Sequence, residues 1–330
     1  YKKTKDLLLN ATLAPSMGFL SAYRNVGSVS NSGLELTIDT KNIQTKEFSW
    51  TSSFNISFNR NKVLSLNDDE PSLASRVNWG NFNNAYPYIA IPGHPIAMFY
   101  GHIFDGVYQY TDFDKVGESY ILKDGVPNNG NAREKIQPGD IKFKDINRDG
   151  VVNDYDLTII GNPNPKHIGG FGNNFQYKNF DLNVFFQWSY GGDVLNANRI
   201  EFEGGDPNAR TSLNMFASFA NRWTPENQTN ELYRIGGQRP AVYSSRTIED
   251  GSFLRLKTVS LGYRLPNAWL KKINIKSLRV YASAQNLITW TRYSGPDPEV
   301  STRPTALTPS FDWSPYPRPR TLTLGVDISF

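Results

Sequence analysis

The stretch that decides the fold is Leu322-Thr-Leu324-Gly-Val326-Asp-Ile328-Ser-Phe330, at the end of the chain. Successive side chains of a strand point to opposite faces, so one face of this segment is purely apolar. The opposite face is small or polar and comprises Thr321, Thr323, Gly325, Asp327 and Ser329. The end of a soluble chain usually frays, whereas a barrel closed in a bilayer pairs its last strand so that no backbone edge faces lipid. The terminal pattern therefore predicts a transmembrane β-barrel.

The composition permits such a barrel and excludes other classes of protein. The 330 residues are 38% hydrophobic with a mean hydropathy of −0.49, and no stretch approaches the roughly 20 apolar residues of a spanning helix. Barrel strands need apolar side chains only at alternate positions. The absence of cysteine excludes a disulfide scaffold and a thiolate metal site. The net charge of +4 is too small to indicate a nucleic-acid partner.

Segments of alternating polarity predict roughly eight antiparallel strands, joined by links of two kinds. The strands are expected near 1–9, 34–39, 48–59, 167–177, 180–190, 252–264, 276–289 and 321–330. Short links near 43–46, 178–179 and 265–275 alternate with long links near 10–30, 63–166, 192–251 and 290–318. Outer-membrane barrels separate short periplasmic turns from long extracellular loops in this way. The pattern places the carboxy terminus on the periplasmic side, and a soluble β-sandwich is the alternative.

One motif in the long 63–166 link indicates a metal site. Counted from its first acid, residues with oxygen ligands or a turn-forming role stand at positions 1, 3, 5, 6, 7 and 12: Asp145, Asn147, Asp149, Gly150, Val151 and Asp156. This is the spacing of an EF-hand-type calcium loop, in which position 7 contributes its backbone carbonyl. The expected role of Ca²⁺ in this 145–156 loop is structural, because the ion would offset repulsion among carboxylates. A solvated acidic turn is the alternative.

The remaining candidate sites have less specific patterns. Aromatic and amide side chains of the long links could bind sugars or form loop cores, namely Trp79, Asn83, Asn84, Tyr86, Tyr88 and Trp313. The three histidines lack the spacing of metal ligands, and neither a Ser/His/Asp arrangement nor a cysteine nucleophile is present. We therefore expect no catalytic residues, no bound organic cofactor and no enzyme activity.

Several segments resemble the SusC/RagA family of TonB-dependent outer-membrane transporters. The resemblance is carried by the terminal strand and by Gly139–Asp156, Ile159–Pro165, Arg222–Asn227, Ser252–Lys257 and Leu278–Leu287. The family implies a barrel of roughly 22 strands. Residues 1–330 would then be the carboxy-terminal part, with about the last eight strands and long extracellular loops. We expect the plug domain and the earlier strands to precede Tyr1.

The resemblance also implies a function and a set of partners. The function is TonB-dependent import of oligosaccharides or peptides across a bacterial outer membrane. The implied partners are a SusD-like lipoprotein, the TonB complex acting through the plug, outer-membrane lipids, and the barrel assembly machinery, which would recognise Phe330. Other possibilities stay open: a non-transporting scaffold of an envelope complex, a small autonomous barrel or adhesin, and a secreted calcium-dependent glycan-binding β-sandwich.

Overall fold

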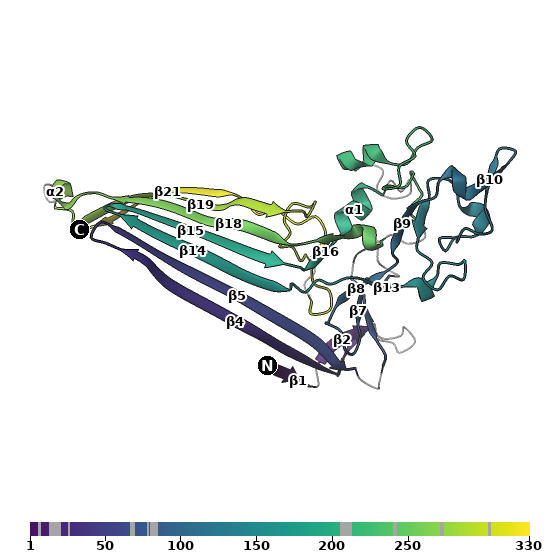
Figure 1. Ribbon diagram of the computed structural model, residues 1–330, viewed down its shortest axis with the longest axis horizontal. Coiled ribbons are helices and arrows are strands. Elements are labelled where there is room, and N and C mark those ends of the chain that lie inside the picture. The colour runs from purple at the N-terminus through teal and green to yellow at the C-terminus, as the bar shows by residue number, and fades with distance from the viewer. Residues whose placement is uncertain are drawn as a thin grey trace.

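An antiparallel sheet of eight strands runs through the chain in simple up-and-down order (Figure 1). The computed structural model describes residues 1–5, 8–12, 21–25, 27–66, 70–77, 79, 85–204, 213–239, 243–270, 274–302 and 305–330. In sheet order the strands are β1 (Lys2–Thr4), β4 (Ser28–Gln44), β5 (Phe48–Ser65), β14 (His167–Tyr177), β15 (Phe180–Tyr190), β18 (Phe253–Arg264), β19 (Ser277–Thr291) and β21 (Thr321–Ser329). The strand expected near 1–9 is shorter than predicted, because β1 pairs with β4 over only 3 residues.

The two ends of the sheet differ in the length of their connections. At one end, here called the turn end, the strands are joined by 45–47, 178–179 and 265–276, the last of which contains helix α2 (Asn267–Leu270). At the opposite end, here called the loop end, the connections are 5–27, 66–166, 191–252 and 292–320. The predicted alternation of short and long links is present, and the long connections form a separate body beyond the sheet (Figure 1).

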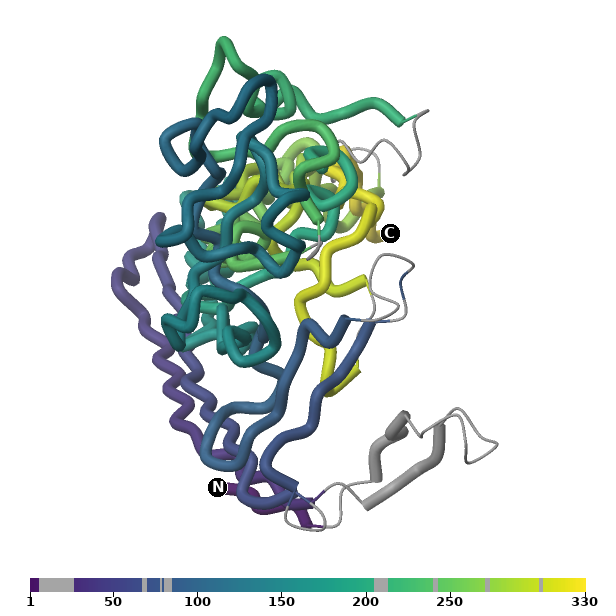
Figure 2. Tube along the Cα trace, turned by 90° about the vertical axis from the view of Figure 1, so that its right-hand side faces the viewer, coloured from purple at the N-terminus to yellow at the C-terminus, as the bar shows by residue number. Residues whose placement is uncertain are grey.

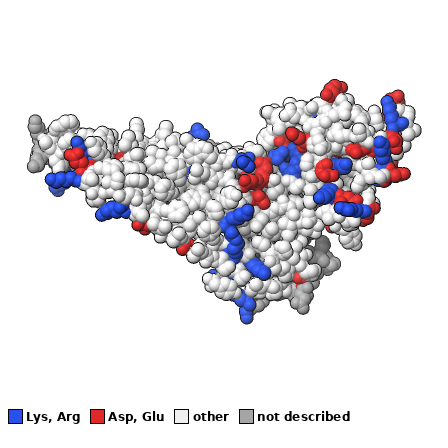
Figure 3. Space-filling model, in the orientation of Figure 1, with Lys and Arg blue, Asp and Glu red and all other residues white. Residues whose placement is uncertain are grey.

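One face of the sheet is apolar and exposed. Leu322 and Leu324 of β21 are 78% and 86% exposed. The apolar face continues in register across the sheet, since Leu324 pairs with Ala282, Ala282 with Leu261, and Leu261 with Leu182. Charged side chains gather at the two ends of the molecule and are sparse over the strands between them (Figure 3). A β-sandwich would cover this face with a second sheet, so that alternative is wrong, and the face has the character of a lipid-facing wall.

The opposite face is polar and is braced near the turn end by one arginine. Arg279 of β19 donates to Asp181 of β15 from Nε at 2.9 Å and from Nη2 at 2.6 Å. Its Nη1 donates to Asp327 of β21 at 3.2 Å. The guanidinium reaches β15 by crossing Gly262 of β18, where a Cβ atom would lie 2.5 Å from Nη2. This glycine therefore lets one bidentate ion pair span three neighbouring strands.

The long connections form small sheets and short helices at the loop end. The sheets are β6 (Leu73–Ser75) with β7 (Tyr88–Ala90), β8 (Met98–Gly101) and β13 (Thr158–Gly161); β9 (Phe104–Val107) with β12 (Ile141–Phe143); β10 (Phe113–Val116) with β11 (Ser119–Leu122); β16 (Asp193–Asn196) with β17 (Ile248–Asp250) and β20 (Phe311–Asp312); and β2 (Leu8–Thr12) with β3 (Ser21–Asn25). The helices are α1 (Ala197–Phe202) and 3₁₀ turns at Tyr110–Asp112, Arg133–Lys135, Asp154–Asp156, Ala217–Asn221 and Ser245–Thr247. Within the described ranges, no helix is long and apolar enough to cross a membrane.

Three of these connections share one hydrophobic core. Tyr88 and Phe99 come from the 66–166 connection, Leu195 from 191–252, and Phe311 from 292–320, and all four are fully buried. Figure 2, which looks onto the loop end, shows the segments of these connections gathered together. These three connections are therefore packed on one another rather than independent.

The apolar face makes a prediction about stability in a bilayer. Replacing Val326, which is 56% exposed and pairs with Val280, by lysine should reduce the free energy of unfolding by about 2–4 kcal/mol, because a charge would face lipid. Lysine in place of Thr323, on the polar face of the same strand, should have a smaller effect. Denaturant titration of the full-length protein in lipid vesicles measures both. Equal losses for the two variants would contradict the assignment of the lipid-facing side.

Candidate functional site

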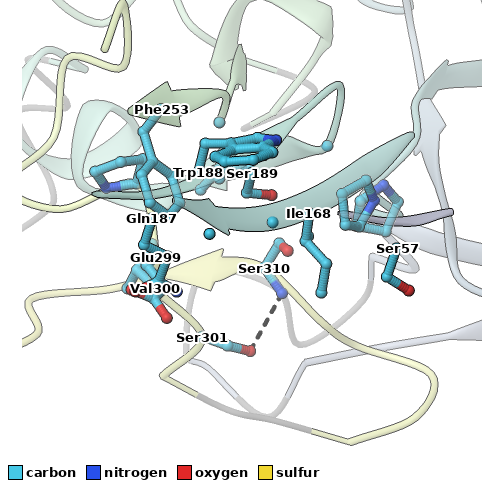
Figure 4. A pocket seen from close by; sticks show the side chains of 18 of the residues that line it. Ser57, Ile168, Gln187, Trp188, Ser189, Phe253, Glu299, Val300, Ser301 and Ser310 are labelled. Carbon is cyan, nitrogen blue, oxygen red and sulfur yellow. Dashed lines mark hydrogen bonds between the residues drawn. The ribbon is translucent and has the colours of Figure 1, made fainter. Parts of the chain in front are cut away.

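A pocket of about 590 Å³ lies at the loop end, against the polar face of the sheet (Figure 4). Strands of the sheet supply one wall, which includes Ser57, Ile168, Gln187, Ser189 and Phe253. The 292–320 connection supplies the opposite wall, which includes Glu299, Val300, Ser301 and Ser310. The pocket is thus bounded by the inner wall of the sheet on one side and by a long connection on the other.

Glycines in β14 give the sheet wall its shape. A Cβ atom at Gly170 would lie 2.8 Å from the ring of Phe185, and one at Gly169 would lie 2.3 Å from the ring of Trp188 on the other face. The two large rings of β15 therefore lie across β14 on opposite sides of the sheet. Both glycines therefore serve close packing, and Phe185 is part of the pocket lining.

A buried cluster of charges fastens the 292–320 connection to the sheet. Arg255 of β18, which is 1% exposed, donates to Asp297 at 2.5 Å, to Glu299 at 3.3 Å and to Thr289 at 3.0 Å. Arg318 pairs with the same two carboxylates, at 3.3 Å from Asp297 and 2.8 Å from Glu299. A buried guanidinium is tolerated only when it is paired in this way. This group, the Arg255 cluster (Arg255, Asp297, Glu299 and Arg318), holds Glu299 at the pocket wall.

A second polar cluster joins the same connection to the 191–252 connection. The hydroxyl of Tyr293 donates to the carboxylate of Asp312, which also accepts from Asn198 Nδ2 at 2.9 Å. Burial raises the pKa of both Tyr293 and Asp312, so the tyrosine keeps its proton and remains a donor at neutral pH. Together with the Arg255 cluster, this contact fixes the connection on both sides of the residues that line the pocket.

The loop predicted to bind calcium is closed by backbone hydrogen bonds to its acids. Asp145 accepts from the N–H groups of Arg148 and Gly150 at 2.6 and 2.8 Å. Asp156 has no exposed surface and accepts from the N–H of Ile146 at 2.7 Å. Gly150 has a φ of +85°, the left-handed conformation that its place in the motif requires. The turn therefore has the local geometry that its sequence predicts.

The donor set of this loop meets the requirement for calcium only in part. Asp149 accepts from Asn147 Nδ2 at 2.9 Å and from the N–H of Val151 at 2.8 Å. An ionised carboxylate has roughly four lone-pair sites, so these bonds leave acceptor capacity for an ion. Within the described ranges, however, no three His, Cys, Asp or Glu side chains are grouped as a metal site. Calcium binding stays a prediction.

The aromatic residues predicted to contact sugars lie in different environments. Tyr88 is fully buried and donates to the carbonyl of Pro309 at 2.8 Å, and Trp79 is 7% exposed with its ring 4.6 Å from that of Trp313. These side chains pack in the core that the three connections share. Tyr86 is 43% exposed and can be reached from solvent, while Asn83 and Asn84 lie outside the described residues. Contact of this group with a ligand stays a prediction, and Phe330 lies 78% exposed at the end of β21.

Reasoning from sequence missed the pocket and the Arg255 cluster. The available sign was an arginine at position 255, which by simple alternation falls on the same face as the apolar Val259 and Leu261. An irregularity in β18 between Leu256 and Thr258 turns Arg255 to the polar face instead. The partners of Arg255 lie in Pro296-Asp-Pro298-Glu, a stretch without periodicity. Nothing in the local pattern of either segment specifies the other as a partner.

The chain is similar in sequence to several TonB-dependent receptors. No protein-family model matches it. The TonB-dependent receptor P3 of Formosa agariphila is 35% identical over 333 residues, which cover 99% of this chain and 31% of the relative. The TonB-dependent receptor SusC of Bacteroides thetaiotaomicron is 29% identical, over 100% of this chain and 29% of that protein.

Solved structures agree with these relatives. The structure of the RagAB peptide transporter superposes with a TM-score of 0.74 and 26% identity, over 99% of this chain and 32% of that one. The chain thus spans about a third of the length of the proteins that it matches, in agreement with the predicted carboxy-terminal portion. These relatives are receptors and transporters rather than enzymes. Over nearly its whole length the chain is therefore similar to the carboxy-terminal third of the SusC/RagA-type TonB-dependent receptors, and its large sheet matches part of their β-barrel.

Proposed function

We propose that this chain is the carboxy-terminal part of a TonB-dependent importer that carries oligosaccharides or peptides across the outer membrane. The observation that supports it best is the pocket between the polar sheet wall and the 292–320 connection. In this proposal the loop end is extracellular and the turn end is periplasmic. A SusD-like lipoprotein binds at the loop end, TonB acts through a plug elsewhere in the protein, and lipids cover the apolar face. The assembly machinery reads Phe330.

The lining of the pocket suits an extended, amphipathic ligand. Phe185, Phe253 and Ile168 offer apolar surface, and Asn55 and Gln187 offer amides that can both donate and accept hydrogen bonds. Ligand sites commonly combine apolar walls with a few polar groups in this way. Sugar rings and peptide segments both have apolar faces next to hydrogen-bonding groups, so the lining supports import of either class.

The fixed wall of the pocket supports a binding role for the 292–320 connection. A loop that is ordered before the ligand arrives loses less conformational entropy when the ligand binds. The Arg255 cluster and the bond between Tyr293 and Asp312 supply that order here. Their buried charges also make the arrangement specific, because removal of one partner would leave another charge unpaired.

Filling the pocket should reduce uptake without affecting barrel assembly. Ser189→Trp in the full-length receptor would place a large ring among the lining residues, and we expect uptake to fall about tenfold, equivalent to roughly 1.4 kcal/mol of lost binding. Thr323→Trp, on the same face near β19 but outside the pocket lining, is the matched control. Growth on defined oligosaccharides or peptides as the sole nutrient measures the effect and identifies the substrate class. Unchanged uptake by a correctly assembled Ser189→Trp receptor would reject the pocket as the binding site.

We also propose that the 145–156 loop binds Ca²⁺ through Asp145, Asn147, Asp149, the carbonyl of Val151, and Asp156. When bound, the ion would neutralise the carboxylates. The side chain of Val152, in the same loop, is 2% exposed and packs in a core with Trp223 of the 191–252 connection. A rigid loop would therefore steady the contact between two long connections.

Calorimetry on the full-length receptor tests the calcium site. Wild type should bind one Ca²⁺ at this loop, and Asp145→Asn with Asp149→Asn should abolish the signal because two charged ligands are lost. Asp154→Asn, in the same loop but not among the predicted ligands, should bind as wild type does. At about 100 times its Kd, the ion should stabilise the folded state by roughly 2.7 kcal/mol in wild type and not in the double variant. Identical isotherms for wild type and the double variant would refute the site.

A further inference from the structure

We propose that the pocket selects ligands by charge, admitting neutral or cationic segments and repelling polyanionic ones such as sulfated glycans or acidic peptides. The inference deepens the proposed import function and rests on it for its biological meaning. The electrostatic property itself belongs to the residues of the pocket and can be measured without transport.

The pocket has acidic lining residues and no basic ones. Asp193 and Glu299 both line it, and none of its described lining residues is lysine or arginine. The charge of Glu299 is already offset, because Arg255 and Arg318 lie 3.3 and 2.8 Å from its carboxylate. Asp193 is different, since no lysine or arginine of the described ranges forms an ion pair with it. The net charge presented by the lining is therefore negative.

Asp193 is held rigidly at the edge of the pocket. It is the first residue of β16, which follows the end of β15 after two intervening residues, and its backbone N–H donates to the carbonyl of Asn162 at 2.8 Å. Its carboxylate accepts the N–H of Asn162 at 2.7 Å, which occupies one oxygen. Burial raises the pKa of Asp193; nearby Asp250 raises it further, and Lys166 lowers it. A fixed carboxylate with spare acceptor capacity suits a ligand ammonium group or sugar hydroxyl.

A second unpaired carboxylate flanks the sheet wall of the pocket. Glu35 of β4 pairs with Ser57 of β5, a lining residue, so both side chains lie on the same face. Directly paired residues have Cβ atoms about 5 Å apart, which places Glu35 beside the pocket. Glu35 is exposed, and no basic group of the described ranges forms an ion pair with it. The carboxylates of Asp193 and Glu35 thus both contribute negative potential to the pocket.

Apart from Arg255, whose charge is paired within the Arg255 cluster, a group of basic side chains of the polar face lies toward the turn end. Arg264, Arg279 and Lys178 line a separate pocket there, of about 420 Å³, together with Asp181. The polar face therefore carries free carboxylates near the loop end and guanidinium groups near the turn end. A cavity lined by one sign of charge raises the local concentration of ligands of the opposite sign.

Charged thiol reagents measure this potential directly. The chain contains no cysteine, so Ser189→Cys in the full-length receptor introduces a reporter thiol into the pocket lining. We expect a cationic trimethylammonium methanethiosulfonate to react about fivefold faster than its anionic sulfonate counterpart at low ionic strength, after correction for their rates with a free thiol. The preference should vanish in about 1 M salt. A receptor without the introduced cysteine supplies the background rate.

Two variants assign the preference to its residues. Asp193→Asn keeps a side-chain oxygen to accept the Asn162 N–H, and Glu35→Gln lies on the open sheet wall; each should reduce the rate ratio about twofold. Glu118→Gln changes the net charge equally at an exposed turn outside the pocket lining and should leave the ratio unchanged. If Asp193→Asn fails to assemble, Glu35→Gln decides the outcome. A ratio of one or below, or a ratio unaffected by both variants, would overturn the proposal, whereas loss of uptake alone would count only against the import function.

Discussion

The hydrogen bonding of the backbone in lipid is the constraint on which this structure depends. A strand that faces hydrocarbon has no water to satisfy its N–H and C=O groups, so each must pair with a neighbouring strand. That requirement explains the strict up-and-down order from β4 to β21 and the continuous register of the apolar face. The side chains of the polar face do not meet lipid, so this requirement does not restrict them, and the charged side chains of the sheet wall lie on that face.

The pocket forms where the sheet and one long connection meet at the loop end. The sheet contributes a rigid wall, and the 292–320 connection contributes a second wall, whose described residues (292–302 and 305–320) have no regular structure beyond the short β20. Arg255 links them, because it belongs to a spanning strand and binds carboxylates of the connection. Removal of one member of this cluster would leave another charge buried and unpaired, which is strongly destabilising. The shape of the pocket therefore depends on the position of the strand that carries Arg255.

Prediction from sequence succeeded where the relevant physics is local. The segment 180–190 alternates with period 2, and the structure has β15 with those bounds. The alternation of short and long links was also predictable, because the length of each link follows from the positions of the alternating segments along the chain. Arg255 and Asp297 were not predictable as partners, since they are 42 residues apart and the stretch around Asp297 has no periodic pattern. The burial of Tyr88 was not predictable for a related reason: an aromatic in a long loop has the same sequence appearance whether it meets a ligand or a loop core.

The shared core of the long connections has a consequence for how such receptors diversify. Tyr88, Leu195 and Phe311 belong to different connections, yet each packs against the same cluster. A change in one connection alone would leave a cavity or a clash in the other two. Variation in this lineage should therefore proceed by coordinated change, and an engineer who wishes to graft a new specificity onto the barrel would have to transplant the three segments together.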